Sequence, residues 1–368
     1  MDEQAAVLLL GSPQDPHIAA VEWALRVNGV RSISAPSFPF GQTSRITVGM
    51  SLNRETLRMS DVPVESLRSV WVRRPKVPSP SFGLPSDHRF LADEWGRIQK
   101  NLFALGGTLT SALWVNSPEA AIRAENKLLQ LHFARQVGLE FPDTLVTNHA
   151  EEAREFISRK GTVIFNTFGM HMWNNRSRGT YHSAGVTVLD RQSQIPDDAL
   201  ALCPGIFQPF VNKQYDVRAT VIGNRIFAVK LGRSGGGAYV DWRVNTRAED
   251  FQAEEYEFPD DVAQRLQSLM QCLGLIFGCA DFVLDDHGKL TFLEINQAGQ
   301  FLFVENMCPS IKILQAMAAM LCHGSSHYRL DDSEPVSLQE FLAGDAQKLD
   351  TEAMERAMPV LSVADIEE

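Results

Sequence analysis

The chain has 368 residues and a formal net charge of −11, so it is long enough for two or three lobes and too acidic for a general nucleic-acid-binding protein. No apolar run reaches membrane-spanning length, and the start Met1-Asp2-Glu3 lacks the basic residues of a signal peptide, so we expect a cytoplasmic protein that does not bind a membrane. The five cysteines include no CxxC pair, which predicts reduced thiols and neither disulfides nor a zinc site.

The first part of the chain has the mixed strand and helix pattern of an α/β lobe. A continuous apolar run predicts a buried strand at residues 5–10, and extended segments are predicted at residues 45–52 and 69–72. Helical periodicity at residues 17–27 and 87–105 predicts the helices of this lobe.

Arg73 and Arg74 directly follow the strand predicted at residues 69–72. Ligands of α/β folds bind at the carboxyl ends of strands, so two guanidinium groups there are candidates for orienting a substrate or a phosphate. Ordinary surface charge is the alternative interpretation.

Helix-start signals mark the beginning of a second unit. Ser117 is a candidate N-cap, and Pro118 suits the first helical position. A second helix is predicted at residues 124–138, with Lys127 near its beginning. A buried strand is then predicted at residues 162–167, followed by a loop at residues 168–181.

Strand-like runs at residues 215–221 and 225–230 are joined by Gly223-Asn224, which predicts a tight hairpin. Asp216 and Arg218 lie two residues apart and therefore on one face of their strand. From these residues alone, a cross-strand salt bridge is the favoured interpretation.

A second hairpin is predicted where apolar runs flank the polar cluster Asp285-Asp286-His287-Gly288. Its pairing places Asp281 opposite or diagonal to Glu294, with Asn296 on the same face. The alternate side chains are expected in the core: Phe282, Leu284, Leu293 and Ile295. Two carboxylates and an amide oxygen that are packed together repel one another unless a cation lies between them. Hard oxygen ligands of this kind suit Mg²⁺. A solvated polar face is the alternative.

The acidic excess is concentrated at the end of the chain. Residues 331–368 include 11 acidic and 2 basic side chains. We expect a solvated acidic tail, with docking of its few apolar residues as the alternative.

Several short motifs resemble the ATP-grasp ligases. Asp281-Phe282 together with residues 292–296 (FLEIN) looks like the metal-binding end of that fold. More narrowly, residues 296–302 (NQAGQFL) with Glu305 resemble the graspetide synthetases, the microviridin-type macrocyclases of ribosomal peptides. Two further segments are similar to motifs of the same family, namely residues 71–75 (WVRRP) and 241–243 (DWR). The resemblance covers about residues 70–325.

The resemblance implies an α/β fold of the ATP-grasp type, with the nucleotide held between two lobes. It divides the chain into an N-terminal α/β domain that precedes the ATP-grasp lobes (residues 1–115), a central lobe (116–205) with a lid loop (168–181), a C-terminal lobe with the Mg²⁺ site (206–328) and the acidic tail (329–368).

The resemblance also implies a role for particular side chains. Mg²⁺ would be held by Asp281, Glu294 and Asn296. ATP would be held by Lys127, Gln208, Phe210, Val211 and Asp216. The reacting groups would be oriented by Arg218, Arg243 and Asp241, and the substrate would be bound by Arg73 and Arg74.

One position departs from the family pattern. A phosphate-binding lysine is expected on the strand at residues 162–167, where Asn166 stands instead. Asparagine donates hydrogen bonds without a positive charge, so its attraction for phosphate is weaker. We expect Arg176 and Arg178 to supply the charge from the lid loop, which would also exclude water.

These features predict an ADP-forming carboxylate ligase. It would activate Asp or Glu side chains of a ribosomal precursor peptide as acyl phosphates and join them to Ser or Thr hydroxyls or Lys amines. Two alternatives stay open: a ligase that adds a free amino acid or small amine to a peptide carboxylate, and a nucleotide-binding protein without turnover, which Asn166 suggests. The resemblance further implies a leader segment in the precursor peptide and a homodimeric enzyme.

Overall fold

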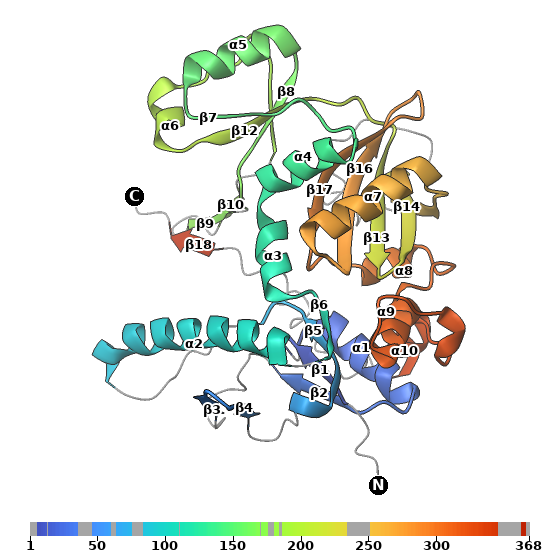
Figure 1. Cartoon of the computed structure of the whole chain (residues 1–368). Coiled ribbons are helices and arrows are strands. Elements are labelled where there is room, and N and C mark those ends of the chain that lie inside the picture. The colour runs from blue at the N-terminus through green and yellow to red at the C-terminus, as the bar shows by residue number, and fades with distance from the viewer. Residues whose placement is uncertain are drawn as a thin grey trace.

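The computed structural model describes residues 6–12, 14–35, 46–59, 64–75, 84–109, 111–169, 171–175, 180–183, 186–233, 251–344 and 362–365. In Figure 1 the N-terminal domain lies at the bottom, the C-terminal lobe at the right and the central lobe at the top. The long helix α2 (His88–Leu109), which connects two strands of the N-terminal sheet, extends sideways from it.

A parallel four-stranded sheet forms the N-terminal domain. Its elements are β1 (Ala6–Leu10), α1 (Pro16–Val27), β2 (Ser32–Ala35), β5 (Leu67–Val72), α2 (His88–Leu109) and β6 (Leu113–Val115). The strand order is β2-β1-β5-β6. A separate hairpin is formed by β3 (Ile46–Ser51) and β4 (Arg54–Met59). The α/β character predicted for this part of the chain is confirmed.

An antiparallel sheet of order β11-β8-β12-β7 forms the central lobe. Its elements are α3 (Pro118–Glu125), α4 (Lys127–Gln136), β7 (Leu145–Thr147), α5 (Ala150–Lys160), β8 (Val163–Asn166), β11 (Thr187–Leu189), α6 (Asp197–Leu202) and β12 (Gly205–Pro209). Because β12 pairs with both β7 and β8, the central sheet continues past the boundary expected at residue 205.

The segment expected as a loop at residues 168–181 contains strands instead. β9 (His171–Asn175) and β10 (Thr180–Ser183) form an antiparallel hairpin, and β18 (Ser362–Asp365) pairs with β9 in parallel. The prediction was wrong here because backbone pairing to a neighbouring strand stabilises an extended segment that has no regular apolar alternation.

A five-stranded antiparallel sheet of order β15-β14-β13-β16-β17 forms the C-terminal lobe. Its elements are β13 (Tyr215–Ile222), β14 (Arg225–Arg233), β15 (Phe251–Glu255), α7 (Asp260–Leu273), β16 (Phe277–Leu284), β17 (Leu290–Asn296), α8 (Leu302–Met307) and α9 (Ile313–His323). Apolar side chains of α7 and α4 cover one face of this sheet, and those of α9 cover the other.

Helix α9 also packs against the N-terminal domain, so the N-terminal domain and the C-terminal lobe share one hydrophobic core. The buried Ser69 hydroxyl donates to the Leu321 carbonyl at 2.8 Å, and Arg68 donates to the Cys322 carbonyl at 2.7 Å. The same core holds α10 (Leu338–Gly344), whose Leu338 and Phe341 are buried. The first part of the expected solvated tail is therefore docked, because these apolar side chains are buried against α1 and the core around it.

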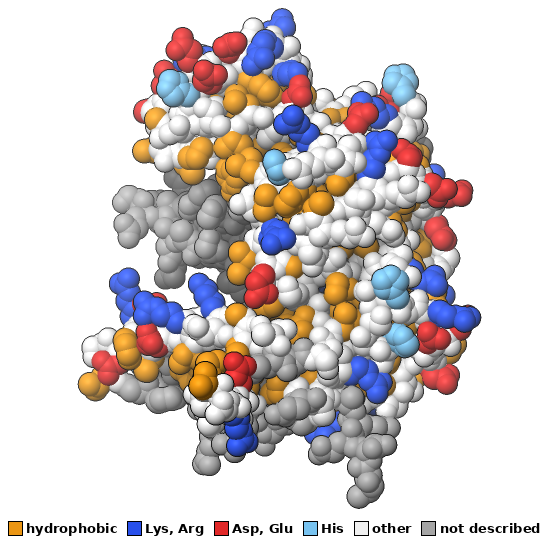
Figure 2. All heavy atoms as spheres, viewed as in Figure 1, with side chains coloured by type: hydrophobic (Ala, Val, Ile, Leu, Met, Phe, Trp, Pro, Cys, Tyr) orange, Lys and Arg blue, Asp and Glu red, His pale blue; other side chains and the backbone are white. Residues whose placement is uncertain are grey.

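No helix among the described segments combines the length and the apolar character needed to cross a bilayer. On the face of the molecule seen in Figure 2, Lys and Arg side chains and Asp and Glu side chains lie in small groups that are spread over the surface. The charge of the described residues on that face therefore does not gather into one area of a single sign.

Candidate functional site

The hairpin of β16 and β17 places two carboxylates directly opposite each other, as predicted. Asp281 is the cross-strand partner of Glu294. A bulge follows, since the next pair is Phe282 with Phe292. Leu293 is the extra residue of this bulge and lines the same pocket as Glu294. The expectation that Leu293 points into the core was therefore wrong, because strict alternation fails at a bulge.

Asp281 forms a buried ion pair with Arg218. Arg218 on β13 is the cross-strand neighbour of Asp281, and its Nη1 lies 2.6 Å from Oδ1 of that carboxylate. The two side chains are only 5% and 8% exposed. Burial opposes the charge of the guanidinium, but Asp281 and the other negative groups nearby outweigh this effect and raise the pKa of Arg218 above its usual value. The cross-strand salt bridge favoured from the sequence is thus present, between Arg218 and Asp281.

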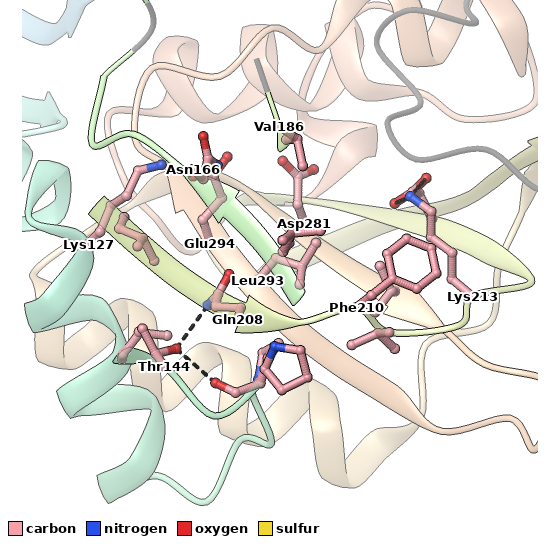
Figure 3. A pocket seen from close by; sticks show the side chains of 18 of the residues that line it. Lys127, Thr144, Asn166, Val186, Gln208, Phe210, Lys213, Asp281, Leu293 and Glu294 are labelled. Carbon is pink, nitrogen blue, oxygen red and sulfur yellow. Dashed lines mark hydrogen bonds and ion pairs between the residues drawn. The ribbon is translucent and has the colours of Figure 1, made fainter. Parts of the chain in front are cut away.

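Glu294 pairs with a lysine from the central lobe. Lys127 Nζ lies 3.1 Å from Oε2 of Glu294, and both side chains are 30% exposed. Lys127 is the first residue of α4, which begins there because the Asn126 side chain accepts a hydrogen bond from the Leu129 amide. The N-cap therefore sets the start of α4, and Lys127 at this start lies beside the carboxylate in the pocket seen in Figure 3.

A second lysine, Lys213, lies in the same pocket and was not singled out from the sequence. Its Nζ lies 2.9 and 2.8 Å from the two carboxylate oxygens of Asp216. Both side chains are buried. Lys213 precedes β13 and lies three residues before Asp216, the second residue of that strand. This close spacing of opposite charges is the sequence signal that could have identified Lys213 as a site residue.

The pocket lies between the central sheet and the β16–β17 hairpin. Its lining includes eight residues predicted from the sequence, namely Lys127, Asn166, Gln208, Phe210, Val211, Asp216, Asp281 and Glu294. Apolar side chains complete it, among them Leu128, Leu131, Ile164, Ile206 and Val283. A pocket that combines apolar walls with charged side chains suits a flat ring carrying an anionic chain.

Two contacts constrain how the β12 segment can bind a ligand. The Phe210 amide donates to the Thr162 carbonyl at 2.9 Å, so this amide does not donate into the pocket. The Gln208 side-chain amide donates to the Thr144 hydroxyl at 2.9 Å, as Figure 3 shows. The resemblance implies that residues 208–211 bond to adenine through their backbone, and such a contact would therefore come from a group other than the Phe210 amide.

Asn166 lies at the end of β8 and lines the pocket without bringing a charge. Its Oδ1 accepts a hydrogen bond from the Thr167 amide at 2.9 Å. Lys127 and Lys213 line the same pocket and provide positive charge there. Since the resemblance already assigns Lys127 to ATP, Lys213 is the additional positive side chain that this pocket offers among the described residues.

Replacing Asn166 with lysine is expected to tighten ATP binding by about tenfold, because one more cation near a polyphosphate adds roughly one charge-assisted interaction. Calorimetric titration of ATP into both proteins measures the change. An unchanged Kd in the lysine variant would mean that β8 does not face the phosphates.

The residues expected to hold a divalent cation fit that role by chemistry. Asp281 and Glu294 provide two carboxylates in register, and Asn296 is two residues farther along β17. Within the described part of the chain, no cluster of three or more His, Cys, Asp or Glu side chains has metal-binding geometry. The resemblance implies that the Asn296 amide is the third ligand. The Asn296 oxygen accepts from the Ala298 amide at 3.0 Å, which closes the turn after β17.

The two N-terminal arginines lie beneath this turn. Arg73 is 1% exposed and donates to the carbonyls of Ala298 and Gly299. Substrate binding does not fit this placement, because a guanidinium buried against protein carbonyls does not reach a solvated carboxylate. Arg74 is only partly buried and also donates to the Ala298 carbonyl, at 3.1 Å. Four other predicted residues, Arg176, Arg178, Asp241 and Arg243, lie outside the described residues.

Comparisons with known proteins identify the fold. No family model and no curated protein sequence matches the chain. Among solved structures, macrocyclase MdnB from Microcystis aeruginosa MRC has a TM-score of 0.67 at 27% identity, covering 86% of this chain and 98% of its own. Macrocyclase MdnC from the same organism, bound with precursor peptide MdnA, has a TM-score of 0.69 at 20% identity, with coverages of 86% and 98%. A RiPP-associated ATP-grasp ligase from Chryseobacterium gregarium, in complex with ADP and with a leader and core peptide, has a TM-score of 0.72 at 23% identity, with coverages of 90% and 99%. The fold predicted from the sequence motifs is confirmed.

Proposed function

We propose that this chain, an ATP-grasp ligase with the fold of the RiPP macrocyclases, uses ATP and Mg²⁺ to close rings in a ribosomal peptide. The observation that carries the proposal is the pocket lined both by two facing carboxylates, Asp281 and Glu294, and by two lysines, Lys127 and Lys213. That combination suits a metal–nucleotide pair, whose phosphates need both a divalent ion and fixed cations.

The nucleotide would lie between the central sheet and the β16–β17 hairpin. The apolar walls would take the adenine, Asp216 the ribose, and Lys127 and Lys213 the phosphates. Asp281, Glu294 and Asn296 would hold Mg²⁺, which when bound neutralises the charge that develops on the transferred phosphoryl group. Lys127 and Arg218, which balance those carboxylates in the structure, would then be available to turn toward anionic groups.

The chemistry follows from a carboxylate, ATP and a nucleophile. A carboxylate oxygen of the peptide takes the γ-phosphoryl group, which leaves ADP and an acyl phosphate. A Ser or Thr hydroxyl or a Lys amine then attacks the acyl carbon, losing its proton as phosphate leaves, and an ester or amide results. Arg218 and Arg243 would orient the acid and stabilise the oxyanion, and Asp241 would position the nucleophile. Arg74 would contact the peptide from the N-terminal domain.

The mass of the product tests this proposal directly. The purified protein is incubated with ATP, Mg²⁺ and the peptide encoded by a short reading frame beside its gene that is rich in acidic and hydroxyl or lysine residues. We expect one ADP and the loss of one water for each new link. A gain of an added amine's residue mass would indicate ligation of a free amine, and ATP binding without any ADP would indicate a protein without turnover. The homodimer stays a prediction.

A further inference from the structure

Residues 297–301, between β17 and α8, form neither helix nor strand, yet distant side chains hold the backbone of this segment and of the β17 residues before it. Gln130 on α4 donates to the Ile295 carbonyl at 2.9 Å and accepts from the Ile295 amide at 2.8 Å. Asn116 donates to the Gln297 carbonyl at 3.0 Å. Arg218 donates to the Gln300 carbonyl at 3.1 Å. Residues 295–302, here called the metal loop, run from the end of β17 to the first residue of α8. They are thus held by α4 of the central lobe, by β13 of the C-terminal lobe and by Asn116 before α3.

The N-terminal domain holds the other side of the metal loop. Arg73 donates to the carbonyls of Ala298 and Gly299, the latter at 3.1 Å. His17, the second residue of α1, accepts from the amides of Phe301 and Leu302 at 3.1 and 3.4 Å through its Nε2. These contacts join residues that are more than 220 positions apart in the chain.

Asp15 connects Arg73 and His17 into one buried network. Its Oδ1 lies 2.9 Å from His17 Nδ1, and its Oδ2 accepts from Arg73 Nε at 3.1 Å. Since Nε2 of His17 accepts from backbone amides, the ring proton belongs on Nδ1, where it is donated to Asp15. Burial and the nearby charge of Arg73 outweigh Asp15 and lower the pKa of His17 to about 4, so the ring is neutral at neutral pH.

The metal loop has no room to shift away from this network. A Cβ at Gly299 would lie 2.5 Å from the Cβ of Cys279 and 3.0 Å from Nη2 of Arg218. Phe301 is fully buried, and its ring lies 4.8 Å from that of His17 and 5.7 Å from that of Phe277. The loop is therefore enclosed between β16 on one side and the N-terminal network on the other.

The structure assigns Asp15, His17 and Arg73 as positioning residues through which the N-terminal domain orders the metal loop and, with it, Asn296. The link is short. Asn296 is tied to Ala298 by a hydrogen bond of its side chain, and Arg73 holds the carbonyl of the same Ala298. The effect on cation binding rests on the proposed function, whereas the ordering of the loop does not.

His17→Phe tests the inference, because phenylalanine keeps the ring volume and removes the acceptor. His17→Gln is the rescue variant, since its side-chain oxygen can still accept from the Phe301 amide. Ser69→Ala is the matched control, because it also removes a buried hydrogen bond between the N-terminal domain and the C-terminal lobe, but to α9 instead of the metal loop.

Hydrogen exchange of the ligand-free proteins, read by mass spectrometry on the peptide covering residues 296–302, is the first measurement. We expect about tenfold faster exchange in His17→Phe, wild-type rates in Ser69→Ala and partial recovery in His17→Gln. Should His17→Phe fail to fold, Arg73→Lys is expected to loosen the same peptide, because its single ammonium keeps the charge but cannot reproduce the separate Nε contact to Asp15 and Nη1 contacts to the two loop carbonyls. Unchanged exchange in the folded variant, or an equal increase in Ser69→Ala, would overturn the inference.

Titration of Mn²⁺ with ADP, followed by water proton relaxation, is the second measurement. We expect the affinity for Mn²⁺ to fall about tenfold in His17→Phe and to be retained in Ser69→Ala. Wild-type protein that binds no Mn²⁺ with ADP would count against the proposed function, and the exchange experiment would still decide whether the N-terminal network orders the loop.

Discussion

Replacing Glu294 with glutamine is expected to lower ADP formation by about a thousandfold while leaving the protein folded. Glu294 faces Asp281 across the β16–β17 hairpin, and the amide removes one of the two charges available to a divalent ion. Stability should change little, because the Lys127 and Glu294 side chains are both partly exposed and such pairs contribute at most about 1 kcal/mol. A coupled assay for ADP, with the precursor peptide present, measures the loss.

Glu254→Gln is the control for this experiment. Glu254 on β15 pairs with Lys230 at 2.7 Å on the same sheet, but it does not line the pocket. It therefore removes one Glu–Lys pair without touching the two facing carboxylates, and turnover should be retained. Equal turnover in Glu294→Gln and the wild type would refute the assignment of Glu294 to the cation.

The pairing of Asp281 with Glu294 could be predicted because strand alternation and one hairpin turn determine it locally. The position of the Leu293 side chain could not be predicted, since the bulge that turns it toward the pocket depends on the pairing register of the folded sheet. His17 was missed for a related reason. Its partners, Phe301 and Leu302, are 284 and 285 residues away, and a single buried histidine carries no periodic signal. Contacts between domains are therefore the part of the site that sequence patterns leave undetermined.

For three arginines, the sequence predicted the region of the site correctly but not what each side chain contacts. The sequence marked Arg73, Arg74 and Arg218 as functional, and all three lie near the metal loop. Their motif located the right region. Only the fold shows that Arg73 points at protein carbonyls, because burial depends on which loop covers the end of β5. A motif thus predicts where charge gathers better than it predicts what each charge contacts.

Replacing Arg218 with methionine is expected to destabilise the ligand-free protein by about 3–5 kcal/mol, since it leaves the buried carboxylate of Asp281 without its guanidinium partner. Methionine keeps much of the side-chain volume, so the loss reports mainly on charge. Arg265→Met is the control. Arg265 pairs with Asp261 at 3.5 Å and donates to the Gly138 carbonyl at 2.7 Å. Both contacts are exposed, with the Arg265 and Asp261 side chains 44% and 66% exposed, so the loss should cost less than about 1 kcal/mol.

Denaturant unfolding of both variants, with and without Mg²⁺ and ADP, measures the two effects. If Asp281 is a cation ligand, Mg²⁺ can take over the charge balance that Arg218 provides, so added Mg²⁺ and ADP should stabilise Arg218→Met more than the wild type. Arg265→Met should gain only as much as the wild type. An equal gain in all three proteins would show that Asp281 pairs with Arg218 for stability alone, and a loss below about 1 kcal/mol in Arg218→Met would show that the pair is not buried in solution.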